Sequence, residues 1–279
     1  MVEGVVVLYY PSEEVIKNIN SYLPFLEKLY VIDNSPSLKW SLIEKLKRLG
    51  EKIVYISNRE NKGIGYALNR GAELAIKDGA KWLLTMDQDS RFKEGDLGRL
   101  IEIAHQESEK TAIVSPVHDE GEKKSGKFVL TTMTSGNLLR LDSYRKVGPF
   151  REEFFMDMID AEYCLRVNRA GYKVRIVKEI LLHHELGNTK QYKLLGFRFF
   201  STNHSPLRRY YTTRNRLAVW KEYGKEFPKF LQEDRKNAIK EIIKILLVER
   251  EKMAKLKAIF KGVRDYRRGR FGPLPEGEL

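Results

Sequence analysis

Short runs of β-branched and aromatic residues alternate with amphipathic segments over the first ninety residues of the chain. The strand-like runs, whose inner positions are almost all apolar, cover residues 4–10, 28–33, 52–57 and 81–86. Apolar residues recur at helical spacing in residues 12 to about 29, 38–49 and 64–76. Strands with no polar alternation are buried on both faces. This order therefore predicts an α/β fold with a mostly parallel central sheet and helices on both faces.

The pattern changes after residue 90. A helix is predicted over residues 96–108 and a strand over 111–116, followed by two antiparallel additions at 127–134 and 137–141. A second helix is predicted from Asp160 to Ala170, with Cys164, Leu165 and Val167 facing inward, and a strand follows at residues 172–177. Ser12, followed by two glutamates, is the predicted N-cap of the first helix.

Polar residues follow each of the predicted parallel strands, where ligands bind in such sheets. The fourth strand ends in Asp87, Gln88 and Asp89. Carboxylates at i and i+2 of an extended segment point to the same side and are hard oxygen ligands, which predicts a Mg²⁺ or Mn²⁺ site. The alternative is a pair of exposed loop acids, with Asp89 capping the next turn.

Three further clusters carry candidate chemistry. Gly136 lies in a turn where the backbone can approach a ligand, although a plain hairpin turn is the alternative. Asp157 and Asp160, three residues apart, can face one cleft at a helix N-terminus, and helix capping is the alternative for either. His183 and His184 precede Gly187 and offer one imidazole to a metal, but such residues are more often ordinary surface or core histidines.

Eight motifs appear in order over about residues 4–217: VVVLYYP, VIDNSP, NRENKGIGYALNRG, LLTMDQDS, TSGNLLRL, VGPFREEFFMDMIDAEYCLRVNRAGY, HHELGN and RRYYTTRN. In this order the chain resembles the inverting glycosyltransferases of family 2, most closely their rhamnosyltransferase-like branch. The resemblance implies a GT-A fold for residues 1–217, with a nucleotide-binding half at about 1–115 and an acceptor half at about 116–217. Residues 218–279 then form a basic, amphipathic helical extension.

The resemblance also implies roles for single residues. Those implied at the nucleotide-sugar donor are Tyr10, Pro11, Asp33, Asn61, Gly63, Asn69, Asp87, Gln88, Asp89 and Arg214. Asp33 matches the acid that recognises the pyrimidine base. Asp87 and Asp89 match the metal-binding DxD motif, with Gln88 as the central residue typical of this branch. Those implied at the acceptor are Ser135, Gly136, Asp157 and Asn215.

Asp160 falls where the family places its catalytic base, and His184 matches a histidine that joins the metal in some relatives, with His183 as a competing choice. Two positions depart from the family pattern. Tyr10 replaces the asparagine often found before Pro11, so the contacts of this residue with the pyrimidine base of the donor are less well defined by the resemblance. Ile159 replaces the glutamate that usually precedes the catalytic aspartate, which leaves Asp157 as an alternative partner.

The activity implied is transfer of a sugar, with inversion, from a nucleotide diphosphate to a hydroxyl group. The branch favours dTDP-rhamnose as donor, while UDP-galactofuranose, UDP-glucose and UDP-galactose remain alternatives. A metal that bridges the diphosphate oxygens neutralises the leaving group, and one carboxylate takes the acceptor proton. The acceptor expected is a glycan or a polyprenyl-diphosphate-linked sugar of a surface polysaccharide.

The charge of the chain is concentrated in its last third. Of 51 Lys+Arg and 38 Asp+Glu, residues 190–279 hold 23 and 10, which leaves 28 of each in residues 1–189. The net charge of +13 therefore lies entirely in the last ninety residues. This asymmetry predicts an anionic partner such as phospholipid headgroups, a phosphorylated acceptor or nucleic acid, against the alternative of a solvated charged face.

Within this basic third, residues 236–263 carry apolar residues at helical spacing. They are Ile239, Ile242, Ile243, Leu246, Leu247, Met253, Leu256, Ile259 and Phe260. A basic amphipathic helix of this kind can lie in a membrane interface. Packing on the catalytic domain or in a homodimer is the alternative.

The expected location is the cytoplasm, with peripheral attachment to the inner face of the cell membrane. The single cysteine, Cys164, fits a reducing compartment and a core position, the first eleven residues lack the features of an export signal, and no window approaches the ~20 apolar residues of a membrane span.

Three other protein classes fit less well. A dehydrogenase is disfavoured because the GIGYAL stretch lacks a third glycine and follows the third strand. A phosphatase of the DxD type would carry Thr or Val at the position of Arg91. A nucleic-acid-binding protein would explain the basic tail but not the acids at the strand ends, so no nucleic acid partner is expected. A non-catalytic relative with the same fold remains the alternative from another class.

Overall fold

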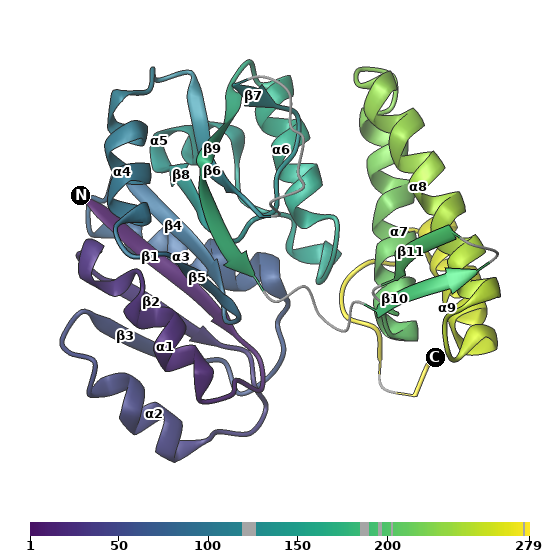
Figure 1. Ribbon diagram of the computed structural model, residues 1–279, viewed down its shortest axis with the longest axis horizontal. Helices are drawn as coiled ribbons and strands as arrows, with labels where there is room; N and C mark the ends of the chain where they lie inside the picture. Colours follow the sequence, from purple (N-terminus) through teal and green to yellow (C-terminus); the bar gives the residue numbers. More distant parts are fainter. Residues whose placement is uncertain (119–126, 185–189, 195–196, 202, 276) are drawn as a thin grey trace. The chain divides into compact units, whose positions relative to one another are not determined.

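The computed structural model describes residues 1–118, 127–184, 190–194, 197–201, 203–275 and 277–279, with the backbone alone within residues 184–201. These residues form two compact units (Figure 1). The first comprises Met1–Glu152 and Ile159–Glu185, and the second comprises Glu153–Met158 and Leu186–Leu279. The functional division expected at residue 217 falls within helix α7 (Pro206–Tyr223) and stays a prediction.

The first unit is built on a nine-stranded sheet with the order β3-β2-β1-β4-β8-β6-β9-β5, in which β7 also pairs with β9. Its strands are β1 (Val2–Leu8), β2 (Leu29–Asp33), β3 (Ile53–Ser57), β4 (Trp82–Asp87), β5 (Ser90–Phe92), β6 (Thr111–Val117), β7 (Phe128–Val129), β8 (Asn137–Arg140) and β9 (Lys173–His184). Strands β1 to β4 pair in parallel, as do β6 and β9. Strand β8 lies antiparallel between β4 and β6, which confirms the expected antiparallel addition to an otherwise mostly parallel sheet.

Helices cover both faces of this sheet, as the sequence pattern predicts. They are α1 (Glu14–Asn20), α2 (Trp40–Lys47), α3 (Ile64–Lys77), α4 (Asp96–Gln106), α5 (Leu141–Val147) and α6 (Ile159–Arg169). One buried cluster joins Val6 of β1 to apolar residues of α1, α2 and α4. Val5, next along the strand, faces α3, and a Cβ added at Gly71 of that helix would lie 2.5 Å from the Val5 Cβ. Glycine at position 71 therefore lets α3 approach the sheet closely.

The first helix is shorter than predicted. Helix α1 ends at Asn20, and a 3₁₀ turn, η1 (Leu23–Phe25), precedes β2. Pro24 explains the difference, because proline lacks the N–H that a continuing helix needs and its ring clashes with the preceding turn. The cap also differs, since Glu13 occupies the N-cap position and no side chain caps the helix.

The bounds of two predicted strands are wrong. Strand β7 covers two residues instead of eight, and β9 continues to His184 rather than ending near residue 177. One strand is missing from the prediction: β5, which follows a turn at Gln88 and Asp89, has three residues. The inward positions predicted for α6 are confirmed, because Cys164, Leu165 and Val167 are all buried.

The second unit contains the hairpin of β10 (Lys190–Leu194) and β11 (Phe197–Ser201) and the helices α7, α8 (Pro228–Leu247) and α9 (Lys252–Arg267). Residues 236–263, which the sequence pattern predicts as one helical stretch, belong to two helices, α8 and α9. Glu251, between them, has a φ of 54°. Helices α7 and α9 pack against each other. None of the helices in the described parts of the chain is long and apolar enough to cross a membrane.

Candidate active site

The carboxyl ends of the four parallel strands lie level with one another in the first unit. Asp33 at the end of β2 pairs in register with Leu8 of β1 and with Ser57 of β3, and Asp87 at the end of β4 pairs with Val7. The acids that follow separate strands in the sequence therefore meet at one edge of the sheet, as expected.

Asp33 is held rigidly at this edge. Its side chain is buried, and its two oxygens accept hydrogen bonds from the Ser35 backbone N–H at 2.8 Å and from the Tyr55 hydroxyl at 2.6 Å. Burial, followed by the bond to Asp33, raises the pKa of Tyr55, so this phenol remains a donor. Tyr10, Pro11 and Asp33 line one small cavity with apolar residues of α2. Tyr55 was missed, because its place in an apolar strand indicates packing rather than a polar contact.

Asn61 and Gly63 shape the loop that enters α3. Asn61 Oδ1 accepts from the Gly63 N–H at 3.0 Å, and the Gly63 carbonyl accepts from Asn34 Nδ2 at 3.1 Å. Asn34 Oδ1 in turn accepts from Asn58 Nδ2 at 2.7 Å. This chain of amides ties the ends of β2 and β3 to the start of α3 beside Asp33. Asn61 and Gly63 therefore help to fix the backbone conformation at this edge of the sheet.

Gln88 joins two strand ends through its side chain. Its Oε1 accepts from the Tyr9 N–H at 2.8 Å, and its Nε2 donates to the Tyr9 carbonyl at 3.2 Å. The Gln88 carbonyl accepts from Asn18 of α1 at 2.9 Å. The amide therefore fixes the turn that carries Asp87 and Asp89 against β1. Beside it lies a hollow of about 250 Å³ whose lining includes Tyr10, Gln88 and Asp89.

Asp87 and Asp89 are half-buried, and the geometry predicted for them needs correction. Gln88 and Asp89 form a turn between β4 and β5, so the side chains do not alternate along an extended segment. Burial, together with the nearby charge of Asp87, raises the pKa of the Tyr22 hydroxyl.

The two aspartates are hard oxygen donors and fit Mg²⁺ or Mn²⁺, which keep open positions for phosphate oxygens. Among the side chains that the structure describes, no group of three or more acidic, His or Cys residues gathers into a metal site. The backbone of His184 pairs with Ser90, the residue after Asp89, whereas its side chain and Gly187 lie outside the described parts of the chain. The side chain of His183 is exposed.

The turn at residues 134–137 is hydrogen-bonded to the turn that carries Asp87 and Asp89. Ser135 is buried, and its hydroxyl accepts from the Asp87 N–H at 3.0 Å and donates to Ser90 Oγ at 2.8 Å. The Gly136 N–H donates to the Thr85 carbonyl at 2.7 Å, and His118 Nε2 donates to the Ser135 carbonyl at 2.7 Å. Ser135 and Gly136, which the resemblance places at the acceptor, thus stabilise the Asp87 turn. Ser90 and His118 were not identified from the sequence.

Asp160 lies in the first turn of α6, where its Oδ1 accepts from the Ala161 N–H at 2.8 Å. It lines a small cavity whose walls also include Thr85, Thr134 and Asn137. The turn that supports Asp87 therefore also borders the cavity at Asp160.

Asn69 lies in the middle of α3, and its side-chain amide makes its hydrogen bonds to other groups of the protein. Its Nδ2 donates to the Phe150 carbonyl and to Glu152 Oε1, and its Oδ1 accepts from the Phe150 N–H and the Tyr144 hydroxyl. These bonds use both amide hydrogens and the carbonyl oxygen. Asn69 thus anchors the chain at Phe150, and the structure offers no support for the donor contact that the resemblance implies.

Asp157, Arg214 and Asn215 belong to the second unit. Arg214 and Asn215 are 1% and 0% exposed, and their side chains bond to protein groups within that unit. Their roles at the donor and the acceptor stay predictions, and the contacts observed are structural.

A family model, "Glycosyl transferase family 2", matches residues 12–180. The chain belongs to this family. The match covers the Asp33, Asp87 and Asp160 positions and ends before α7. The family assignment and the α/β fold expected from the motifs are both confirmed.

One relative in this family is the "dTDP-rhamnosyl transferase RfbF" of Shigella flexneri, which is 30% identical over 239 residues, 76% of this chain and 77% of the relative. Solved structures share the fold at low identity. The "GalNAc-T7 with UDP, GalNAc and Mn2+" structure has a TM-score of 0.58 and 14% identity, over 80% of this chain but only 48% of that one. The S. aureus "TarS 1-349 in complex with UDP-GlcNAc" structure has a TM-score of 0.52 and 12% identity, over 95% and 72% of the two chains.

Proposed function

We propose that this family 2 glycosyltransferase transfers rhamnose from dTDP-rhamnose, with inversion, to a hydroxyl of a glycan or a polyprenyl-diphosphate-linked acceptor in surface polysaccharide synthesis. The choice of donor is supported by the relative named for dTDP-rhamnosyl transfer. A UDP-linked galactofuranosyl, glucosyl or galactosyl donor is the alternative. The observation that carries the proposal is the shared turn at residues 134–137, which supports Asp87 and borders the cavity lined by Asp160.

Three tasks are divided among the acids of the site in this proposal. Asp33, held by Ser35 and Tyr55, recognises the pyrimidine base. Asp87 and Asp89 would hold Mg²⁺ or Mn²⁺, which would neutralise charge on the diphosphate leaving group. Asp160 accepts the proton of the attacking hydroxyl, a contribution of ~10²–10⁴-fold.

Calorimetry with dTDP and UDP, each with and without Mn²⁺, tests the binding half of the proposal. We expect metal-dependent binding of at least one nucleotide that is lost in Asp87→Asn, with Glu13→Gln as an exposed control. A donor-hydrolysis screen over dTDP- and UDP-sugars identifies the sugar. Asp160→Asn should abolish turnover of the selected donor with nucleotide binding intact, and near-normal turnover would remove Asp160 from the mechanism.

We also propose that α8 binds an anionic membrane surface at the inner face of the cell membrane. Five of its apolar side chains recur at helical spacing and are 39–59% exposed, namely Ile239, Ile242, Ile243, Leu246 and Leu247. Lysines at positions 236, 240 and 244 accompany this stripe. Apolar side chains next to basic ones suit the boundary between acyl chains and anionic headgroups, at ~1 kcal/mol for each basic residue near the surface.

Flotation with vesicles that contain phosphatidylserine tests the membrane proposal. The protein should float with these vesicles, and the variant Ile239→Ser/Ile243→Ser/Leu246→Ser should not, while the exposed polar change Gln232→Ser should have no effect. Equal flotation with neutral vesicles would contradict the charge argument. A wild-type dimer that the triple substitution dissociates would assign the stripe to self-association instead.

A further inference from the structure

The segment Glu153–Met158 adopts a backbone conformation that needs support from outside itself. Phe155, Asp157 and Met158 have φ values of 64°, 58° and 63°, in the left-handed region that residues other than glycine rarely adopt. Each such residue costs ~1–3 kcal/mol and persists only where surrounding contacts fix it. The chain enters α6 at Ile159 directly after this segment, and Asp160 is the second residue of that helix.

Helix α7 supplies the contacts through Arg214 and Asn215. Asn215 Nδ2 lies 2.9 Å from the Phe154 carbonyl, 2.7 Å from that of Met156 and 3.0 Å from that of Asp157. Arg214 Nη2 donates to the carbonyls of Glu153 at 3.2 Å and Phe154 at 3.0 Å. Two adjacent side chains thus hold four carbonyl groups of the strained segment.

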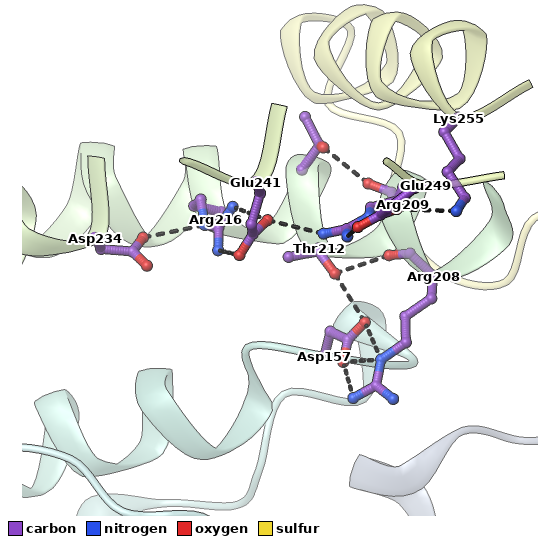
Figure 2. Close-up of polar contacts among 10 residues, drawn as sticks. Asp157, Arg208, Arg209, Thr212, Arg216, Asp234, Glu241, Glu249 and Lys255 are labelled. Carbon is purple, nitrogen blue, oxygen red and sulfur yellow. Dashed lines mark hydrogen bonds and ion pairs between the residues drawn. The ribbon is translucent and has the colours of Figure 1, made fainter. Parts of the chain in front are cut away.

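The Asp157 side chain is held by the first half of the same helix. Arg208 Nε lies 3.0 and 3.2 Å from the two Asp157 oxygens, Arg208 Nη2 lies 3.0 Å from Oδ1, and the Thr212 hydroxyl donates to Oδ2 at 2.9 Å (Figure 2). The carboxylate is 14% exposed. A carboxylate bound by a guanidinium at both oxygens and by a hydroxyl is occupied by the protein itself.

Aromatic stacking and a backbone hydrogen bond also hold the segment Glu153–Met158. The ring of Phe155 stacks on Tyr211 with centroids 5.1 Å apart, and Phe154 stacks on Phe271 at 6.0 Å. The Gly272 N–H donates to the Glu153 carbonyl at 2.7 Å. The segment is therefore held by α7 and by residues 271–272 together.

We infer that Arg208, Thr212, Arg214 and Asn215 of α7 are positioning residues for the general base, because they fix residues 153–158 and with them the path by which the chain enters α6 at Asp160. This inference rests on the proposed role of Asp160. It assigns to Asp157 an anchoring task in place of the acceptor contact that the resemblance implies. It also assigns a structural role to Arg214 and Asn215, the RN pair of the last motif, because their side chains hold the backbone of residues 153–158.

The alternative, in which Asp157 itself touches the acceptor or shares its proton, makes different predictions for kinetics. An anchor acts only through Arg208 and Thr212, so removal of either partner of the ion pair should have the same effect as removal of both. An acceptor ligand would add its own loss to that of Arg208. An acid or base would also change the pH dependence of kcat, which an anchor leaves in its original shape.

The test uses the full-length protein and the nucleotide sugar that the wild type hydrolyses fastest, with water as acceptor. Asp157→Ala and Arg208→Ala should each lower kcat by ~10- to 100-fold, the scale of a small misplacement of a reacting group. The double variant should be no slower than either single variant, and Arg208→Lys should recover part of the loss. Affinity for the nucleotide with Mn²⁺ should not change, because Asp33 and the Asp87 backbone are held by Ser35, Tyr55 and Ser135 and not by residues 153–158.

Two further readouts separate positioning from general damage. The acid limb of the kcat–pH profile should persist at the wild-type position in Asp157→Asn. Amide hydrogen exchange within residues 153–161 should accelerate in Arg208→Ala and stay unchanged in the exposed control Lys225→Ala.

Normal kcat in Arg208→Ala, additive losses in the double variant, or loss of the acid limb in Asp157→Asn would each overturn the inference while leaving the proposed function intact. Unchanged hydrogen exchange in an Arg208→Ala protein with lowered kcat would do the same. A wild-type protein that hydrolyses none of the donors would overturn the proposed function itself.

Discussion

Glu249, between α8 and α9, is the residue whose neutralisation should destabilise the second unit most. Its Oε1 lies 2.9 Å from Arg209 Nη2 and its Oε2 lies 2.9 Å from Lys255 Nζ. The side chains of Glu249 and Lys255 are fully buried, and that of Arg209 is 5% exposed. Figure 2 shows this group continuing along α7, where Arg209 and Arg216 share Glu241 and Arg216 also pairs with Asp234.

The charges of this group balance, since three cations face three anions. Glu249→Gln keeps the shape of the side chain but removes the carboxylate that Arg209 and Lys255 share, so that of the ion pairs described only Arg209–Glu241 still neutralises either cation. Breaking a buried pair in this way costs ~3–5 kcal/mol. At ~2–4 °C for each kcal/mol in a protein of this size, the midpoint of thermal unfolding should fall by roughly 6–20 °C.

Thermal unfolding followed by circular dichroism measures this change. The matched control is Glu13→Gln, which removes an equally close but exposed partner of Lys45, 2.7 Å away, and should produce no measurable shift. Lys255→Met should cost less than Glu249→Gln, because it leaves the Arg209–Glu249 pair intact. Equal shifts for Glu249→Gln and Glu13→Gln, or a Glu249→Gln effect that salt removes, would refute the reasoning, since buried pairs are screened little.

Three further predictions concern single positions. Gly71→Ala should lower stability by ~1–3 kcal/mol in a denaturant titration, because its Cβ would overlap the Val5 side chain. Ser135→Ala should weaken metal-dependent nucleotide binding in calorimetry, because it removes the acceptor of the Asp87 N–H; unchanged affinity would contradict this. Burial, reinforced by two nearby arginines, lowers the pKa of His204 from 6.5 to about 4, so the stability that its neutral form contributes is present above pH 6.5 and is lost as the pH falls towards 4. His204→Gln should flatten the fall in melting temperature over that interval, and an unchanged slope would exclude His204 as its source.

The sheet and its acidic edge could be predicted because their signals are local. Apolar runs of strand length, each followed by a helix of regular period, leave few arrangements other than a parallel sheet. Asp33 and Asp87 follow two of these runs, so their meeting at one edge follows from the sheet itself.

The remaining features depend on contacts between distant parts of the chain. Gln88 bonds to a residue 79 positions earlier, and Asn215 bonds to carbonyls about 60 positions earlier. Neither contact leaves a periodic signal, so the resemblance assigned both side chains to ligands. Strand β5 has three residues, too few for a pattern to form. Pro24, by contrast, was a signal in the sequence that the helix prediction overlooked.

The segment Glu153–Met158 has a consequence for synthesis of the chain. Domains form in order as they leave the ribosome, and the sheet strands up to β8 precede this segment. Its own partners lie much later, on α7 and at Phe271 and Gly272. A nascent or prematurely terminated polypeptide that stops short of residue 271 thus lacks part of what secures the approach to Asp160, so Asp160 takes its final position only after α7 and residues 271–272 have been made.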